Sequence, residues 1–439
     1  MTIKTADRPF YGWKLAAVLW FALAINYALS TYGLSILNVH MGDELQLNRA
    51  TQGSAFALFM LMTGLPGPLV AKLIDNAGIR TTLVLGNIGL VIGAVAMATI
   101  VTTSWMLIMI AGLVIGSANA IAGPITIQAS VTRWFYRRRA LAMGLVLSGS
   151  SIAGMIAAPL LEGVVAETGS WRNGWWLIAA LAAIAVVVCW RFVVEAPVDL
   201  DQNPDGDASV QDHEAAPVAA AAAARVHLTQ EDWLPRDVLR SGVFWALLIC
   251  SIGVSAAFTI FLAQGVLHMR DLGFSTALAA RLISLSVGAG FAAHLMIGFI
   301  ADRVDPRKIF IAGLVFQGSG MALFAGAKSL ALLYPAVAFL GIGAHTSILA
   351  IVMVFGNWFG ARAAPFVFGF GSAFSAAFGA LAPVASGYCY DLTGTFVPVL
   401  YVVSALCFMG AGILAFLKPP HLLQPLVAVT EPELTRRGA

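Results

Sequence analysis

Charged residues are scarce in this chain of 439 residues. Only 11% of them are Asp, Glu, Lys or Arg, whereas 59% are hydrophobic and the mean hydropathy is +0.86. So little polar surface cannot cover soluble domains of this size. The composition therefore excludes an ordinary soluble enzyme and indicates a chain that is embedded in a membrane.

Several chemical signatures are missing as well. The four cysteines fall within or at the edge of apolar runs and show no CxxC spacing, so neither a disulfide framework nor a metal site is expected. No Walker sequence for nucleotide binding occurs, and no cluster of histidines or acidic residues marks one membrane face, as a membrane enzyme would require. We therefore expect no enzyme activity, no metal and no cofactor.

The apolar residues form runs of about 18 to 27 residues, the length that a helix needs to cross a hydrocarbon core. Helices are expected because lipid offers no partner to unpaired backbone groups, and because the runs do not alternate as barrel strands do. The sequence predicts twelve membrane-spanning helices, at 13–39, 52–73, 81–101, 105–131, 140–162, 173–193, 241–268, 276–300, 308–327, 329–356, 363–388 and 397–417.

The positions of the cations predict the orientation. With the N-terminus inside, the inner segments hold all but five of the 25 lysines and arginines. Such an excess is the positive-inside pattern. We therefore expect a multi-pass protein of a bacterial-type inner membrane with both termini in the cytoplasm. The five exceptions are Arg49, Arg172, Arg270, Arg281 and Lys328.

The amino-acid composition changes between the sixth and seventh spans. Residues 196–237 are rich in acidic residues around an alanine run and lack apolar periodicity, which indicates a cytoplasmic linker. Features on its two sides repeat at a near-constant offset: the loop at 71–83 recurs at 298–310, an offset of 227, and Ala158-Pro159 recurs as Ala382-Pro383, an offset of 224. This repeat predicts duplicated halves with a cavity between them near the membrane midplane.

The repeat also divides the chain. The expected domains are an N-terminal six-helix bundle at 1–195, the cytoplasmic linker at 196–237, a C-terminal six-helix bundle at 238–418 and a cytoplasmic tail at 419–439.

The repeated loop, AKLIDNAGIRTTL and then GFIADRVDPRKIF, resembles the G-x-L-A-D-R-x-G-R-x-x-x-L signature of the major facilitator superfamily. Ala71 replaces its first glycine in one copy, and Asp305 replaces the later glycine in the other. The resemblance implies an all-α fold of twelve helices in two pseudo-symmetric bundles that work by alternating access. A carboxylate at a helix end, set against guanidinium groups and a helix N-terminus, can hold two bundles together in one state. The expected conformational latch consists of Asp75, Gly78, Arg80, Gly298, Asp302, Arg303 and Arg307.

The stretch RWFYRRRALAMGLVLSGSSIAG, residues 133–154, resembles the fifth-helix signature of the monocarboxylate porter branch, as in bacterial monocarboxylate and oxalate porters. Topology places its arginines in a short inner loop, where they fix orientation and contact anionic headgroups; lipid is the expected partner and nucleic acid is not. The small residues after them would let another helix pack closely and slide. The signature residues are Arg138, Arg139, Gly144, Gly149 and Gly154.

Ionisable residues inside the membrane are functional candidates. By the resemblance, His294 stands where a substrate-binding arginine is usual, and Gly290 stands at the place of its acidic neighbour. An imidazole could bind a carboxylate and a proton together. We therefore expect His294 and His345 at the substrate site. Arg281, near the outer end of its helix, either guides an anion or extends its side chain to the membrane interface. A neutral histidine that is hydrogen-bonded inside the bundle remains the alternative for both.

Neutral polar residues complete the predicted site. Helix one of this fold class lines the cavity, so its polar side chains could orient a substrate by hydrogen bonds. The predicted residues are Asn26, Tyr27, Thr31 and Tyr32, with Asn119, Gln128, Gln264 and Tyr388 as weaker candidates and Glu162 as an interfacial residue.

The sequence thus predicts a monomeric secondary transporter that moves a small organic anion, a monocarboxylate, by proton symport. The proton gradient is favoured over ATP because the Walker sequence is missing. A porter of the same fold for another cargo stays open: a dicarboxylate, an aromatic acid or an exported amphiphile. That alternative arises because the cations that many monocarboxylate porters carry are absent; Thr31, for example, stands where many have a lysine.

Overall fold

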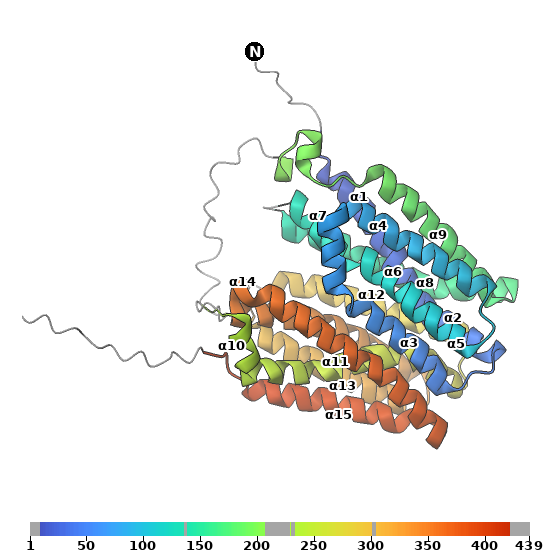
Figure 1. The fold of residues 1–439 in the computed structure, drawn as a ribbon. Helices are drawn as coiled ribbons and strands as arrows, with labels where there is room; N and C mark the ends of the chain where they lie inside the picture. The colour runs from blue at the N-terminus through green and yellow to red at the C-terminus, as the bar shows by residue number, and fades with distance from the viewer. Residues whose placement is uncertain (1–8, 136–137, 207–228, 230–232, 301–303, 422–439) are drawn as a thin grey trace, which may run out of the picture.

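The chain folds into two groups of long helices that lie side by side. The computed structural model describes residues 9–135, 138–206, 229, 233–300 and 304–421 (Figure 1). Throughout these residues the regular structure is helical, and eleven of the described helices are long and apolar enough to cross a membrane. The architecture confirms the predicted all-α membrane fold of two bundles.

The N-half, residues 9–206, contains the helices before the predicted linker and the first part of that linker, which forms the short turns η3 and η4. Two short π-helical turns interrupt its first and fourth spans. Its elements are α1 (Gly12–Leu23), η1 (Ala24–Leu29), α2 (Ser30–Glu44), α3 (Arg49–Gly64), α4 (Gly67–Thr99), α5 (Ser104–Met109), η2 (Ile110–Gly116), α6 (Ser117–Ala122), α7 (Pro124–Trp134), α8 (Arg139–Thr168), α9 (Trp171–Phe192), η3 (Pro197–Leu200) and η4 (Pro204–Gly206).

The group after the linker is called the C-half, residues 233–421. It begins with a short helix and continues with long ones. Its elements are α10 (Pro235–Arg240), α11 (Gly242–Asp271), α12 (Thr276–Ile300), α13 (Pro306–Gly326), α14 (Leu330–Thr393) and α15 (Val397–Phe416).

The second predicted span accounts for the difference between eleven observed membrane-length helices and twelve predicted spans, because α3 has only 16 residues. The second predicted span is divided between α3 and the first turns of α4, which then turns at Gly78 and continues as the third span. Gly360 joins the tenth and eleventh spans in the same way inside α14. The φ angles of these two glycines, +84° and +73°, lie in the left-handed region that favours glycine.

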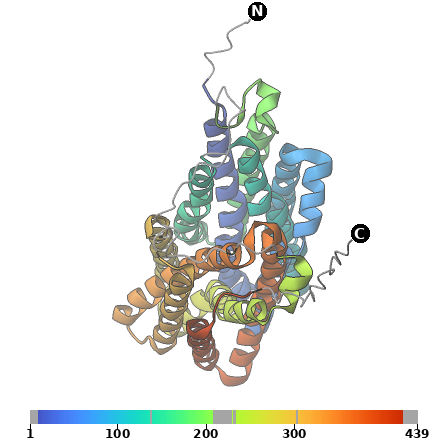
Figure 2. The same ribbon diagram turned by 90° about the vertical axis from the view of Figure 1, so that its left-hand side faces the viewer.

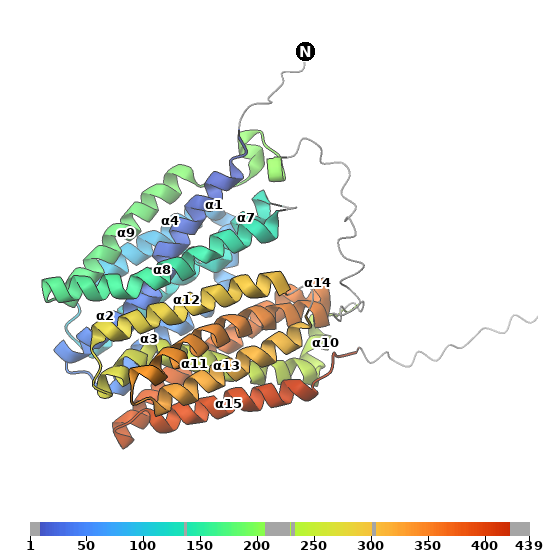
Figure 3. The same cartoon turned by 180° about the vertical axis from the view of Figure 1, so that it is seen from behind.

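The helix ends define two sides of the molecule. The linker side carries the start of α1, the ends of α9 and α15 and the start of α11; it lies toward the left in Figure 1 and faces the viewer in Figure 2. The distal side carries the connections from α2 to α3 and from α11 to α12. On the distal side the ribbons of the two halves lie close together, and toward the linker side they spread (Figure 3).

The halves meet along α3 and the second part of α14, which run antiparallel. A Cβ atom at Gly387 would lie 2.5 Å from the carbonyl oxygen of Arg49, and one at Gly64 would lie 2.5 Å from the Cβ of Ala376. Between these points, a Cβ at Gly53 would overlap the carbonyl oxygen of Pro383. Backbone-to-backbone contact therefore runs along most of α3, as small residues permit between membrane helices.

Candidate functional site

A small cavity lies among α11, α12, α13 and α14 of the C-half, and Tyr32 of α2 borders it from the N-half. The volume of the cavity is about 10 Å³, which is roughly room for one water molecule. Phe258 and Phe261 contribute to its mostly apolar wall, while Gln317 and His345 bring polar atoms. The cavity is therefore a place near mid-membrane where both halves touch a common space.

The wall of the cavity contains one member of a histidine pair. The rings of His294 and His345 have centroids 4.9 Å apart and meet edge to face at 77°. The Nδ1 atom of His345 lies 3.0 Å from the carbonyl oxygen of Gly341. An Nδ1–H that donates to this carbonyl leaves Nε2 as the atom that accepts a proton. The structure thus brings together the two histidines that the sequence analysis singled out separately.

Gly290 makes room for this pair. A Cβ atom at this position would overlap the Nδ1 atom of His345. The imidazole of His345, on α14, therefore fills the space where a side chain at position 290 would begin. The resemblance places an acidic residue at position 290. No local sequence pattern reports this contact, because 55 residues of chain separate the two positions.

Helix one supplies Tyr32 to the cavity, but its other polar residues turn to the interior of the N-half. Asn26 and Thr31 are fully buried. Asn26 donates to Oδ1 of Asn87 at 3.5 Å, and Asn119 donates to Oγ of Ser30 at 3.0 Å and to Oγ1 of Thr31 at 3.5 Å. The turns η1 and η2 flank this cluster, as π-helical turns often flank functional sites.

The remaining predicted site residues lie apart from the cavity. Tyr27 packs beside the apolar core on the linker side of the N-half, and Arg281, Gln128 and Tyr388 are exposed. Gln264 donates to the carbonyl oxygen of Arg49 and so belongs to the seam between the halves.

Glu162 is buried within the protein, near the distal end of α8. Its carboxylate lies 2.8 Å from Nε2 of His40, a partner that the sequence analysis did not name.

The predicted small-residue face of helix five is present over part of its length. A Cβ at Gly149 would lie 2.7 Å from the carbonyl oxygen of Trp20, and one at Gly154 would lie 2.5 Å from the ring of Tyr32. Gly144 has no neighbour within 4 Å. The close approach of α8 therefore helps to position Tyr32 at the cavity.

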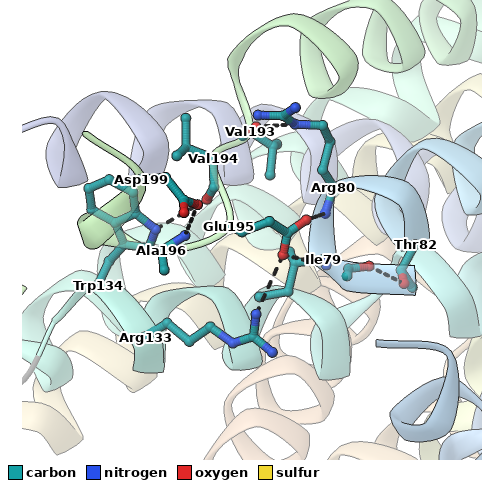
Figure 4. A network of polar contacts seen from close by, with 11 residues as sticks. Ile79, Arg80, Thr82, Arg133, Trp134, Val193, Val194, Glu195, Ala196 and Asp199 are labelled. Atoms are coloured by element: carbon teal, nitrogen blue, oxygen red, sulfur yellow. Dashed lines mark hydrogen bonds and ion pairs between the residues drawn. The ribbon is translucent and has the colours of Figure 1, made fainter. Parts of the chain in front are cut away.

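On the linker side of the N-half, a carboxylate that the sequence analysis missed organises the predicted latch loop (Figure 4). Glu195 accepts hydrogen bonds from the backbone N–H groups of Ile79 and Arg80, both at 2.8 Å, and lies 3.4 Å from the guanidinium of Arg133. A Cβ at Gly78 would come within 2.7 Å of this carboxylate. Glu195 thus caps the helix that resumes after Gly78.

In the C-half, the helix after the corresponding loop is also capped by a carboxylate. Asp305, which stands at the place of Gly78, accepts from the backbone N–H of Arg307 at 2.9 Å. Both halves share a second contact: Arg80 donates to the carbonyl oxygen of Val193 at 2.5 Å, and Arg307 donates to that of Leu417 at 2.6 Å. Each arginine therefore caps the last helix of its own half.

Other members of the predicted latch make no contact between the halves that the structure describes. Asp75 is exposed, and its side chain has no hydrogen bond or ion pair within the described residues. Gly298 lies in the last turn of α12. Asp302, Arg303 and the side chain of Arg139 lie outside the described part, whereas Arg138 is exposed and its backbone N–H donates to Asp205 at 3.3 Å.

Comparison with known proteins identifies the family. The family model described as Major Facilitator Superfamily matches residues 19–303 and 267–435. The chain belongs to this superfamily. Monocarboxylate transporter 13 of Bos taurus is 24% identical over 94% of this chain and 90% of its own, and the uncharacterized transporter YycB of Bacillus subtilis is 23% identical over 91% and 92%. The crystal structure of a mutant of the nucleoside transporter NupG superposes with a TM-score of 0.70 at 16% identity, covering 91% of this chain and 99% of that one.

The cap that Glu195 provides can be tested by Glu195→Gln. The change removes the charge that faces Arg133 and weakens the acceptor for two backbone N–H groups, so we expect a loss of about 1 kcal/mol in the free energy of unfolding. Thermal unfolding in detergent measures it. Glu167→Gln, at an exposed position, is the matched control and should change nothing. Equal stability of both variants would contradict the role of Glu195.

The close contact at Gly290 can be tested by Gly290→Ala. The new methyl group would overlap the ring of His345, so the ring must shift from its buried position. We expect diethylpyrocarbonate to modify His345 several-fold faster, measured by peptide mass spectrometry.

Gly288→Ala is the matched control for this test. Its new Cβ would meet only the end of the Met155 side chain, at 3.1 Å, which can yield. An unchanged modification rate in Gly290→Ala would show that position 290 does not determine where the ring lies.

Proposed function

We propose that this protein is a secondary active transporter that carries a small monocarboxylate together with a proton by alternating access. The observation that supports it most directly is the His294–His345 pair beside a cavity that Tyr32 borders from the other half. Membership of the superfamily supports the transporter fold. A relative that is named a monocarboxylate transporter, and that matches over nearly its whole length, supports the class of cargo.

The histidine pair accounts for coupling between anion and proton. Among the described residues that line the cavity there is no lysine or arginine, so an anion finds a fixed positive charge only when an imidazole is protonated. A carboxylate then binds after, or together with, its proton. This order of binding is what obligatory symport requires.

The same pair favours a single negative charge on the cargo. Two imidazolium ions at 4.9 Å would repel each other by about 3 kcal/mol at an effective dielectric constant of about 20. The pair therefore holds one proton at a time, which matches a monocarboxylate better than a dicarboxylate. Phe258 and Phe261 would face the hydrocarbon part of the cargo, so aromatic monocarboxylates belong in any test panel.

We place the linker side in the cytoplasm and the protein, as a monomer, in an inner membrane of bacterial type. The positive-inside asymmetry supports this orientation, since Arg80, Arg133 and Arg307 all lie on the linker side. The proton gradient would supply the driving force without a bound cofactor.

Uptake into proteoliposomes tests the cargo. The panel contains labelled short aliphatic, aromatic and dicarboxylic acids, each with and without a proton gradient directed inward. We expect saturable uptake of one or more monocarboxylates, faster with the gradient and slowed again by a protonophore. If no acid enters in a saturable manner that depends on the gradient, the proposal is wrong.

The role of the histidines is tested in the same vesicles. We expect His294→Ala and His345→Ala each to reduce gradient-stimulated uptake at least about tenfold, because the anion loses either the imidazole in the described cavity wall or the imidazole beside it. His421→Ala, beyond the last helix, should transport at the wild-type rate. If the gradient still stimulates uptake fully in the His294→Ala, His345→Ala double variant, another group must carry the proton.

A further inference from the structure

Gln317 of α13 lines the cavity and carries an oxygen atom that has no hydrogen-bond partner among the described residues. The side chain is fully buried, and its Nε2 donates to the carbonyl oxygen of Val254 at 3.1 Å. Only the amide nitrogen can donate to a carbonyl, so this bond fixes which end of the amide is Oε1. A buried acceptor without a donor destabilises a structure, which makes Oε1 a natural contact for a ligand.

Two hydroxyl groups lie in the same wall. Tyr32 comes from α2 and Ser286 from α12, and both side chains are buried. In the part of the chain that the structure describes, neither hydroxyl forms a hydrogen bond. Three helices thus bring groups with free hydrogen-bonding capacity to one small and mostly apolar space. Such convergent polar groups orient a ligand in a binding pocket.

Close backbone contacts hold two of these groups in place. A Cβ atom at Gly341 would overlap the backbone of Ser286, and one at Gly343 would overlap the backbone of Gln317. Both α12 and α13 therefore lie directly against α14, which also carries His345. Because these contacts leave no free space, Ser286, Gln317 and His345 keep their mutual positions, as a selective site requires.

The three groups of the C-half differ in what they can bind. The hydroxyl of Ser286 can donate a hydrogen bond, as can a protonated His345, so either can hold a carboxylate. The Oε1 atom of Gln317 only accepts, and a carboxylate only accepts as well, so these two repel each other. The oxygen of Gln317 therefore has to face a different part of the cargo, one that carries a hydrogen on oxygen or nitrogen.

We propose that Gln317 determines specificity: its Oε1 accepts a hydrogen bond from a hydroxyl or amide N–H group that the cargo carries in addition to its carboxylate. This role rests on the proposed function of the same cavity. In the proposed cycle the cavity widens as Tyr32 withdraws with the N-half, while the three groups of the C-half stay together. A cargo without such a donor leaves Oε1 buried and unpaired, so it binds more weakly.

Matched ligands test this selectivity. The panel contains a linear monocarboxylate, its derivatives with a hydroxyl or an acetylamino group at each successive carbon atom, and the methylated counterpart of each derivative, which lacks the donor. Binding to the purified full chain is measured in detergent as the ligand concentration that gives half of the maximal thermal stabilisation. At one position or more, we expect the wild type to bind the donor compound at least about tenfold more tightly than its methylated counterpart and the unsubstituted acid.

Two substitutions of Gln317 separate recognition from general damage to the fold. Gln317→Met removes the oxygen from an unbranched side chain, so we expect the preference for the donor compound to fall at least about fivefold while the unsubstituted acid still binds. Gln317→Glu keeps an acceptor oxygen and should keep the preference. Val315→Met, exposed on the same helix, is the matched control and should behave as the wild type. A merely structural role would weaken all ligands equally and leave the preference unchanged.

Methyl esters of the same compounds distinguish this proposal from that of the cargo. If the esters bind with the donor preference and the acids do not bind, the monocarboxylate is wrong and the role of Gln317 stands. That role is rejected if the wild type prefers no donor compound in either series, or if Gln317→Met keeps the preference of the wild type. Both proposals are rejected if neither series binds.

Discussion

Lipid offers no hydrogen-bond partner, and this constraint governs nearly every polar contact in the protein. Inside the membrane, polar groups therefore satisfy one another: Asn119 bonds to Ser30, and His345 bonds to the carbonyl of Gly341. The other places where backbone groups lack partners are helix ends, and there the chain supplies charged caps such as Glu195 and Asp391. The cap in the loop after Gly78 and the cap by Asp391 on the start of α3 both meet that requirement.

The caps differ in what they connect, and this difference separates rigid parts from moving ones. Arg80 and Arg307 each tie an early loop of a half to the end of its last helix, so each bundle is closed on itself. Asp391 instead caps a helix of the other bundle. In the proposed alternating-access cycle, bonds of the first kind would persist while the halves move against each other, whereas bonds of the second kind would break. Rigid-body motion of the two bundles is the simplest movement that this pattern of hydrogen bonds permits.

The sequence predicted the fold well because the fold depends on properties that are local. Long apolar runs specify helices, and a repeat at an offset near 225 residues specifies two halves. The site was harder to predict. His294 and His345 were both named, yet their contact across two helices leaves no trace in spacing. Asn26 and Thr31 were placed correctly in helix one, but the direction of their side chains depends on packing against α4 and α6. Glu195 lies just after the end of α9 and directly before the predicted linker, and no motif marks it.

The contact between Gly290 and His345 also restricts which substitutions are tolerated at position 290 of α12, where the resemblance places an acidic residue. A carboxylate cannot enter at position 290 while the imidazole fills that space, and removal of the imidazole alone would leave a void beside His294. Either single step passes through a disfavoured intermediate. We therefore expect the two positions, one on α12 and one on α14, to change together.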